Sequence, residues 1–371
     1  MENQALTKPS LTLELSTSLQ DNQSVYVVGN FNNWQAGQPE FRMVAKENGV
    51  YRFIFPEDQE LPLPIEYKYT LGNWDSVELD TMGNGIPNRQ LFQNTGLVKD
   101  KVPYWMSSGK NYLDTFLPKV EILSENFEMP QLIKTRRITA LLPHNYYDTD
   151  KHYPVLYLQD GQNLFDDYAP YGNWAVDKKL AFLTEQGMGD VIIIAIDHAA
   201  EERIAEFTPS HQTKLGAGDG KKYVRFLADT LKKYIDRKFR TRPEREFTGI
   251  GGSSMGGLIS MYAGLKYPEV YSKLMIFSPS LWVDPHIAVR ADEYFATFES
   301  KIYIYAGEQE SPTMLPNIMR FKSALERNRI DESRIAFQLS VDPKGEHNES
   351  RWGIEFPKAI EWLFFKNSEL V

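Results

Sequence analysis

Cysteine is absent from this sequence of 371 residues. A chain without cysteine forms no disulfide, offers no thiolate to a zinc ion and has no cysteine nucleophile. The sequence also lacks a run of about 18 apolar residues, the length at which a helix crosses a membrane. Its first residues, MENQALTKPS, lack the basic start and apolar core of a secretory signal. These absences predict a cytoplasmic protein that does not associate with membranes.

Positive charge is scarcer than negative charge. The chain has 41 Lys and Arg against 50 Asp and Glu, a formal net charge of −9 at pH 7. Nucleic acids and anionic membranes bind positive surfaces, so we expect neither as a partner. The sequence has no HExxH motif and no Cys/His cluster, and segment 78–85 lacks the ligand series of a calcium loop. We therefore predict an activity that needs no metal and no cofactor.

Apolar and aromatic residues are present in the amounts that a large core needs: 42% of the chain is hydrophobic and 13% is aromatic. The length exceeds that of one typical domain. In residues 1–98, apolar and polar residues alternate, as at Leu11, Leu13 and Leu15, and short β-rich runs are separated by turn-forming residues. Such alternation is typical of half-buried strands. We predict a small β-sandwich for residues 1–98.

The pattern changes in residues 133–371. Compact apolar runs rich in β-branched residues are typical of parallel strands covered on both faces. They occupy 154–159, 191–196, 247–251, 273–277, 301–306 and 335–340. Between them apolar residues recur at helical spacing, so we predict an α/β domain with a mainly parallel sheet and helices on both faces. Residues 99–132 are interpreted as a linker because they contain Pro103, Gly109, Pro118 and Pro130.

One glycine-rich turn carries the strongest chemical signal. Gly252-Ser253-Ser254-Met255-Gly256 follows a predicted strand and opens a predicted helix. A G-x-S-x-G sequence in that context is a nucleophile elbow, which presents its serine above the edge of the sheet. A phosphate-binding turn is the alternative, but the sequence has no Walker lysine and no GxGxxG with a partner acid. We therefore predict that Ser254 is a nucleophile.

A serine nucleophile needs a base and an acid, and in this kind of fold the acid precedes the histidine in the chain. Two of the six histidines follow Ser254. His347 comes directly after the last predicted strand, whereas His286 follows an earlier one, so we predict His347 as the base. Glu308 and Glu310 both follow the preceding strand. Either could orient the imidazole, and spacing alone leaves the choice open.

A tetrahedral intermediate also needs donors for its oxyanion. The N–H of Met255, which directly follows the nucleophile, is the first predicted donor. The second comes from the loop after an earlier strand, here Asp160-Gly161-Gln162, and the N–H of Gln162 is our assignment. A main-chain donor requires no particular side chain, so this assignment rests on position.

Taken together, these motifs resemble the putative-esterase family of α/β-hydrolases, which includes enterochelin-type siderophore esterases, feruloyl esterases and esterase D. The similar segments are YLQDGQNLF, GNWAVD, KKYIDRKFRTRPE, GGSSMGGLISMYAGLKYPEVY, FSPSLW and GEHNESRW. The family's Gly-x-x-Asp/Glu pattern implies Glu310 as the acid, and its Gly-x-His-x-x-x-x-Trp pattern falls on His347 and Trp352. One departure is Gln159, where many members carry histidine.

The resemblance also suggests residues that contact substrate. Trp174 and Trp352 lie in similar segments, and Arg203 lies in a loop expected near the mouth of the site. We assign all three to substrate binding, although Arg203 and the nearby Glu206 could equally form structural ion pairs.

Residues 10–95 resemble starch-binding carbohydrate-binding modules and related immunoglobulin-like domains, through VYVVGNFNNW and IEYKYT. In such modules aromatic rings stack on glucose and a lysine bonds to its hydroxyls. The resemblance places these roles on Trp34 and Lys68, with Trp74 as a second ring outside clean register. Trp34 could instead cover the edge of the core.

The sequence therefore predicts a two-domain serine ester hydrolase with Ser254, His347 and Glu310 as its triad. A carbohydrate-linked ester fits the first domain, and a siderophore-type ester fits the domain order. The expected partners are a small ester and, through the first domain, a glucan. The alternatives are an acyltransferase and a non-catalytic carbohydrate-binding or regulatory protein on an esterase scaffold.

Overall fold

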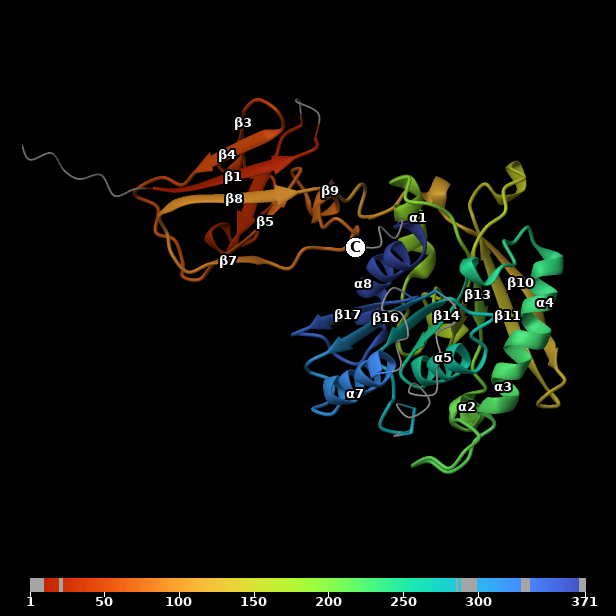
Figure 1. The fold of residues 1–371 in the computed structure, drawn as a ribbon. Coiled ribbons are helices and arrows are strands. Elements are labelled where there is room, and N and C mark those ends of the chain that lie inside the picture. Colours follow the sequence, from red (N-terminus) through yellow and green to blue (C-terminus); the bar gives the residue numbers. More distant parts are fainter. Residues whose placement is uncertain (1–9, 20–22, 285, 288–298, 328–333, 367–371) are drawn as a thin grey trace, which may run out of the picture. The chain divides into compact units, whose positions relative to one another are not determined.

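The computed structural model describes residues 10–19, 23–284, 286–287, 299–327 and 334–366 (Figure 1). It divides into two compact units, Met1–Leu113 and Asp114–Val371. This boundary lies inside segment 99–132, which the sequence indicated to be a linker, so the segment is shared between the units.

Unit 1 is built from short strands in two main sheets. The four-stranded sheet has the order β3-β4-β1-β8 and the three-stranded sheet the order β2-β5-β7, with a small β6-β9 pair beside them. The strands are β1 (Leu11–Thr17), β2 (Tyr26–Gly29), β3 (Val44–Ala45), β4 (Val50–Ile54), β5 (Ile65–Thr70), β6 (Glu78–Leu79), β7 (Arg89–Leu91), β8 (Gly96–Val102) and β9 (Tyr104–Trp105). Leu11, Leu13 and Leu15 of β1 are buried and their neighbours are not, as the alternation predicted.

Unit 2 contains one eight-stranded sheet of order β10-β11-β13-β12-β14-β15-β16-β17. The pairs β10–β11 and β11–β13 are antiparallel, and the remaining pairs are parallel. The strands are β10 (Lys119–Met129), β11 (Lys134–Leu142), β12 (Val155–Gln159), β13 (Ile192–Ile196), β14 (Thr248–Ser253), β15 (Lys273–Phe277), β16 (Ser300–Gly307) and β17 (Ile335–Asp342). All residues of β12, β13 and β14 are buried, as continuous apolar strands in a covered sheet should be.

Helices cover both faces of this sheet (Figure 1). α1 packs on α8, while α2 and α3 pack on α5. The helices are α1 (Val176–Glu185), α2 (Arg203–Phe207), α3 (Gly220–Phe226), α4 (Lys232–Lys238), α5 (Met255–Lys266), α7 (Met314–Arg327) and α8 (Glu349–Ile360). This is the α/β-hydrolase architecture that the sequence predicted, and it brings the loops after β12, β14, β15, β16 and β17 to one edge of the sheet.

The predicted linker differs most from the observed structure. Residues 96–102 form β8, which pairs in parallel with β1, and residues 119–129 form β10 at the edge of the large sheet. Both carry many charged residues because each is exposed on at least one side, and the register of β10 shifts at Ser124. Such irregularities interrupt the alternation by which a strand is recognised.

Candidate active site

Ser254 occupies the sharp turn between β14 and α5. Its backbone has φ 56° and ψ −121°, a conformation that non-glycine residues seldom adopt and that functional turns often contain. The turn is possible because its glycines allow close contact: a Cβ on Gly256 would lie 2.7 Å from the Asp160 carboxylate. Main-chain bonds fix the serine on both sides, from Ser254 N–H to Phe277 O at 2.9 Å and from Ser280 N–H to Ser254 O at 3.0 Å. This is the geometry of a nucleophile elbow.

His347 lies in the loop between β17 and α8, and its imidazole contacts a carboxylate. His347 Nδ1 is 2.8 Å from Glu310 Oε2. The Glu310 side chain is 1% exposed, whereas that of His347 is 40% exposed. The structure thus pairs the imidazole with a buried acid and leaves its other side toward solvent.

Of the two glutamates that the sequence left open, Glu310 is the one that reaches His347. Its second oxygen, Oε1, accepts from the Gly307 N–H and from the Ser278 hydroxyl, both at 2.7 Å. Glu308 is exposed on the same loop, where its own N–H bonds to Asp342 O.

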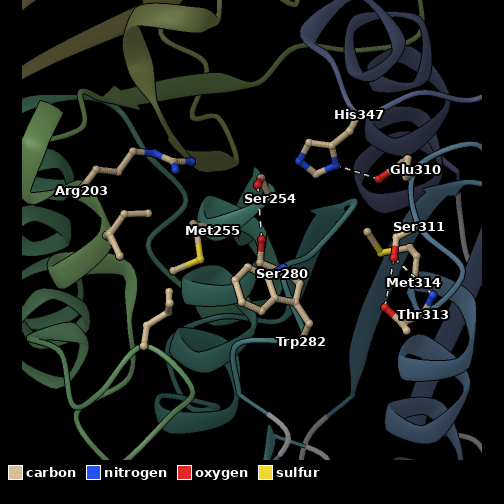
Figure 2. A pocket seen from close by; sticks show the side chains of 12 residues that line it. Arg203, Ser254, Met255, Ser280, Trp282, Glu310, Ser311, Thr313, Met314 and His347 are labelled. Carbon is tan, nitrogen blue, oxygen red and sulfur yellow. Dashed lines mark hydrogen bonds and ion pairs between the residues drawn. The ribbon is translucent and has the colours of Figure 1, made fainter.

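Ser254, His347 and Glu310 line one cavity of about 770 Å³ (Figure 2). Ser254 Oγ lies 3.3 Å from Ser280 Oγ, and Figure 2 shows the His347 ring above this pair. The rest of this cavity is largely apolar, with Ile204, Leu215, Met255, Trp282 and Met314 on its walls. An adjoining cavity of about 710 Å³ shares Arg203, Ser254 and His347 but is more polar, with Asp160, Asn163, His198, Glu201 and Glu349 in its lining.

The two predicted oxyanion donors belong to segments beside Ser254. Met255 is the first residue of α5, so its N–H is one of those that a helix leaves without an internal acceptor. Gln162 lies in the turn after β12, where Asp160 adopts φ 58°.

The side chain of Gln162 makes contacts that the sequence did not predict. Its Nε2 donates to His198 O at 3.1 Å, and its Oε1 accepts from His198 N–H at 2.9 Å. The amide thus joins the loop after β12 to the loop after β13, so the identity of this side chain matters even where a main-chain donor is sought.

Two of the three predicted substrate-binding residues line the cavities. Arg203 lines both, and its guanidinium binds the Asp160 carboxylate through Nε at 2.6 Å and Nη2 at 2.8 Å. Trp352 lines the polar cavity and packs edge-on against His347 with ring centroids 5.0 Å apart. Trp174 is 2% exposed and packs against Phe277 and Trp352, outside the lining of either cavity, so the structure gives it a packing role.

Other titratable residues lie apart from the His347–Glu310 pair or border the loop after β12. The N–H of His286 donates to Asp284 Oδ1 at 3.1 Å, and the same oxygen lies 2.9 Å from His211 Nε2. Burial raises the pKa of Asp197, which directly follows β13, to about 6. Burial also raises the pKa of Glu349 and lowers that of His198.

Sequence reasoning missed Ser278 and Ser280, which contact the predicted acid and nucleophile. The signal was available in the segment FSPSLW, which was noted only as part of a resemblance. Ser278 has φ 44°, so it too lies in a strained turn at the end of a strand.

In unit 1, the rings of Trp34 and Trp74 lie side by side, with centroids 6.3 Å apart and planes inclined by 39°. Trp74 is 45% exposed. Lys68 donates to Ile86 O, and burial lowers the pKa of its ammonium group. The two rings therefore lie next to each other, while Lys68 is bound within the unit.

The part of the chain that the structure describes lacks two features, a membrane-spanning helix and a group of metal ligands. No helix in this part is long and apolar enough to cross a membrane. No group of three or more His, Cys, Asp or Glu residues within the same part of the chain could hold a metal ion.

A family model described as "Putative esterase" matches residues 130–363, which include the elbow and the His347–Glu310 pair. The chain belongs to the putative esterase family. This esterase is therefore a carboxylic ester hydrolase.

The esterase is similar to two proteins that are named as esterases of ferri-bacillibactin and of enterobactin. It is 27% identical over 182 residues to the ferri-bacillibactin esterase BesA of Bacillus subtilis, covering 43% of this chain and 60% of that one. The crystal structure of the enterobactin esterase FES from Shigella flexneri superposes with a TM-score of 0.54 and 15% identity, covering 95% of this chain and 92% of that one. The latter likeness concerns the fold.

A different and shorter similarity concerns an α-amylase. An α-amylase from Niallia circulans is 34% identical over 88 residues, which amount to 22% of the esterase and 6% of the amylase.

Proposed function

We propose that the esterase works by a Ser–His–Glu triad through an acyl-enzyme. The observation that carries this proposal is the 2.8 Å contact between His347 Nδ1 and the buried Glu310, in one cavity with the strained Ser254. Ser254 Oγ attacks the ester carbonyl while His347 Nε2 takes its proton. Glu310 keeps the proton of Nδ1 in place and stabilises the imidazolium that forms.

The attack gives a tetrahedral intermediate, which breaks down to an acyl-enzyme that water then hydrolyses. The N–H groups of Met255 and Gln162 hold the oxyanion. His347 protonates the departing alcohol, which leaves the acyl group on Ser254. A water molecule, whose proton His347 takes, attacks the acyl-enzyme, and His347 returns that proton to Ser254 Oγ as the acid is released. Ser254 Oγ lies 3.3 Å from Ser280 Oγ, from which it can accept a hydrogen bond while it donates its own hydrogen to His347.

We propose a carbohydrate-linked or siderophore-type ester as the substrate. An apolar cavity and a polar cavity meet at Ser254, an arrangement that suits an ester joining an apolar or aromatic acid to an alcohol rich in hydroxyl groups. The names of BesA and FES support the siderophore class. An acyltransferase would use the same groups, with a second alcohol in place of water.

The test is a panel of chromogenic acyl esters, feruloylated sugars and catecholate siderophore esters, assayed with Ser254→Ala alongside. We expect the variant to retain its unfolding temperature and to lose about 10⁴–10⁶-fold in turnover. Ser107→Ala, at an exposed turn of unit 1, serves as the control. A Ser254→Ala protein with a tenth of the normal turnover contradicts the proposed nucleophile, and ester formation with an added sugar alcohol supports the transferase.

A second proposal concerns unit 1: that Trp34 and Trp74 bind a glucan. The adjacent rings and the exposure of Trp74 support it, since aromatic faces stack on sugar rings. Retention of the whole protein on insoluble starch, lost in Trp74→Ala, is the expected result. No retention of the unaltered protein contradicts the proposal, and leaves the alternative that these rings only cover the edge of the core.

A further inference from the structure

Ser278 stands between the acid of the proposed triad and a tryptophan. It directly follows β15, is 0% exposed and has φ 44°. Its N–H bonds to Tyr305 O at 2.8 Å, which ties this strained turn to β16. Strained residues persist where the surrounding structure holds them in place, and they occur often at functional sites.

The hydroxyl of Ser278 takes part in two hydrogen bonds. Trp352 Nε1 donates to Ser278 Oγ at 2.8 Å, and Ser278 Oγ lies 2.7 Å from Glu310 Oε1. An indole N–H can only donate, and an ionised carboxylate can only accept. The single hydroxyl hydrogen must therefore point to Glu310, which gives the chain of bonds one direction.

This direction has a consequence for Glu310. Its Oε1 is held by Ser278 and by the Gly307 N–H, so the plane of the carboxylate is fixed. Oε2 is then the oxygen that meets His347 Nδ1. A catalytic imidazole works only in the correct tautomer and orientation, and these are set by the acid beside it.

We propose that Ser278 and Trp352 are positioning residues that act through Glu310: the indole N–H orients the Ser278 hydroxyl, and the hydroxyl orients the carboxylate. This inference rests on the proposed triad. It gives Trp352 a role beyond lining the polar cavity, because the same side chain also packs against the His347 ring and so contacts the pair from two sides.

The inference predicts how the variants behave singly. Ser278→Ala removes a hydrogen bond to a charged group and should lower kcat about 10–100-fold, with KM changed less than about threefold. Trp352→Phe keeps a ring at that position and removes the N–H, so we expect a smaller loss, about 3–10-fold. Glu308→Gln is the matched control on the acid's own loop. Thermal unfolding of each variant shows whether the fold is retained.

The deciding experiment combines the variants in the full-length protein. Because Trp352 acts through Ser278, the double variant Ser278→Ala/Trp352→Phe should lose no more kcat than Ser278→Ala alone. Because Ser278 acts through Glu310, Ser278→Ala should have no further effect in a Glu310→Ala background. Residues that act as a unit show such non-additivity, whereas a general structural effect does not.

Two results would overturn the inference while leaving the triad intact. One is an equal loss from Ser278→Ala with and without Glu310, and the other is a rise in KM at unchanged kcat. A Glu310→Ala protein with normal turnover would instead contradict the triad itself, so the two failures are distinguishable.

Discussion

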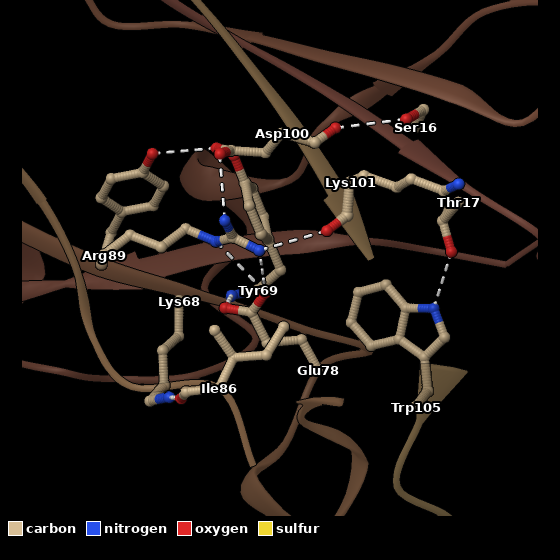
Figure 3. A network of polar contacts seen from close by, with 11 residues as sticks. Ser16, Thr17, Lys68, Tyr69, Glu78, Ile86, Arg89, Asp100, Lys101 and Trp105 are labelled. Atoms are coloured by element: carbon tan, nitrogen blue, oxygen red, sulfur yellow. Dashed lines mark hydrogen bonds and ion pairs between the residues drawn. The ribbon is translucent and has the colours of Figure 1, made fainter. Parts of the chain in front are cut away.

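Both units bury a carboxylate beside hydrogen-bond donors, but the partner of the carboxylate is more exposed in unit 2, where it is 40% exposed, than in unit 1, where it is 20% exposed. In unit 1, Arg89 binds Glu78 through Nε and Nη2 and binds Asp100 through Nη1, while its Nη2 also donates to Lys101 O (Figure 3). The Glu78 side chain is 0% exposed. In unit 2, the partner of buried Glu310 is His347, which is 40% exposed and lines a cavity.

This difference in exposure predicts that the unit 1 cluster contributes to stability and the unit 2 cluster to catalysis. Four hydrogen bonds join Arg89 to neighbours within unit 1, so most of its five donors are already used. The imidazole of His347 uses one nitrogen for Glu310 and presents the other to the cavity that also contains Ser254. We therefore expect substitutions in the first cluster to change the free energy of unfolding and those in the second to change turnover.

The largest expected effect is a loss of kcat on substitution of Glu310, the acid of the unit 2 cluster. Glu310→Gln should lower kcat by about 10⁴, because an amide in this position favours the wrong imidazole tautomer, as in the general triad template. Glu308→Gln, an exposed neighbour, should change kcat little. Steady-state kinetics of both variants test this, and the opposite ranking would assign the acid to Glu308.

A smaller loss of turnover is expected at Gln162. Gln162→Glu keeps the acceptor for His198 N–H and replaces the donor to His198 O with a carboxylate oxygen. The loop would then move, but its main-chain N–H would remain, so we expect a loss in kcat of about 10–100-fold, below the 10²–10³ of a donor removed outright. Unchanged kcat would show that this amide does not position the loop.

In the unit 1 cluster, Arg89→Leu should destabilise unit 1 without changing kcat. It leaves Glu78 buried without its cation, at a cost of about 2–4 kcal/mol. Burial raises the pKa of Glu78 and Arg89 lowers it, so without Arg89 the pKa of this carboxyl rises further. At low pH the carboxyl is protonated and leaves no buried charge, whereas at higher pH the folded variant must either hold an unpaired carboxylate or keep the proton. The destabilisation should therefore be larger at pH 8 than at pH 5.

Hydrogen exchange of the full-length protein measures this effect separately in each unit. Arg89→Leu/Glu78→Leu is the matched control, and it should recover part of the lost protection because the fully buried charge of Glu78 is gone, while Asp100 keeps the hydrogen bonds from Tyr67 and Tyr69. Equal loss of protection in both units, or a fall in kcat, would contradict the assignment of this cluster to the stability of unit 1.

The smallest effect is expected at Asp197, beside the loop after β12. Burial raises its pKa to about 6, so its contribution to stability is complete below its ordinary pKa and is lost as pH rises through about 6. A shift of roughly two pKa units corresponds to about 3 kcal/mol at pH 7. Asp197→Asn removes this cost but also loses the attraction of Arg137, whose Nη1 lies 3.8 Å from Asp197 Oδ2, so we expect a net stabilisation of about 1–2 kcal/mol. The measurement is the free energy of unfolding of Asp197→Asn and of the unaltered protein at pH 4 and at pH 7. If the change between the two pH values is the same in both proteins, this prediction is contradicted.

The sequence indicated the elements of unit 2 because they follow a repeated physical pattern. Apolar runs marked the buried strands, and the small residues around Ser254 marked a turn that larger side chains would block. The order of acid and histidine in the chain then indicated which loops meet. These signals are local, so a single sequence contains them.

Contacts between distant residues left no such signal. The choice between Glu308 and Glu310 depends on the turn after β16 and on Ser278, 32 residues from Glu310. Trp352 reaches Ser278 across 74 residues, and Gln162 reaches His198 across 36. The strands β8 and β10 were missed for another reason: their exposed, charged residues and the shift of register in β10 obscured the period of two.

The measurement that tests the central claim most directly is peptide mapping by mass spectrometry after reaction with a fluorophosphonate, which forms a stable covalent analogue of the acyl-enzyme. The account predicts one adduct on the peptide that contains Ser254, formed with loss of ester hydrolysis, absent in Ser254→Ala and slowed in Glu310→Gln. An inactivated protein labelled at another residue, or a protein that hydrolyses esters without being labelled at Ser254, would contradict it.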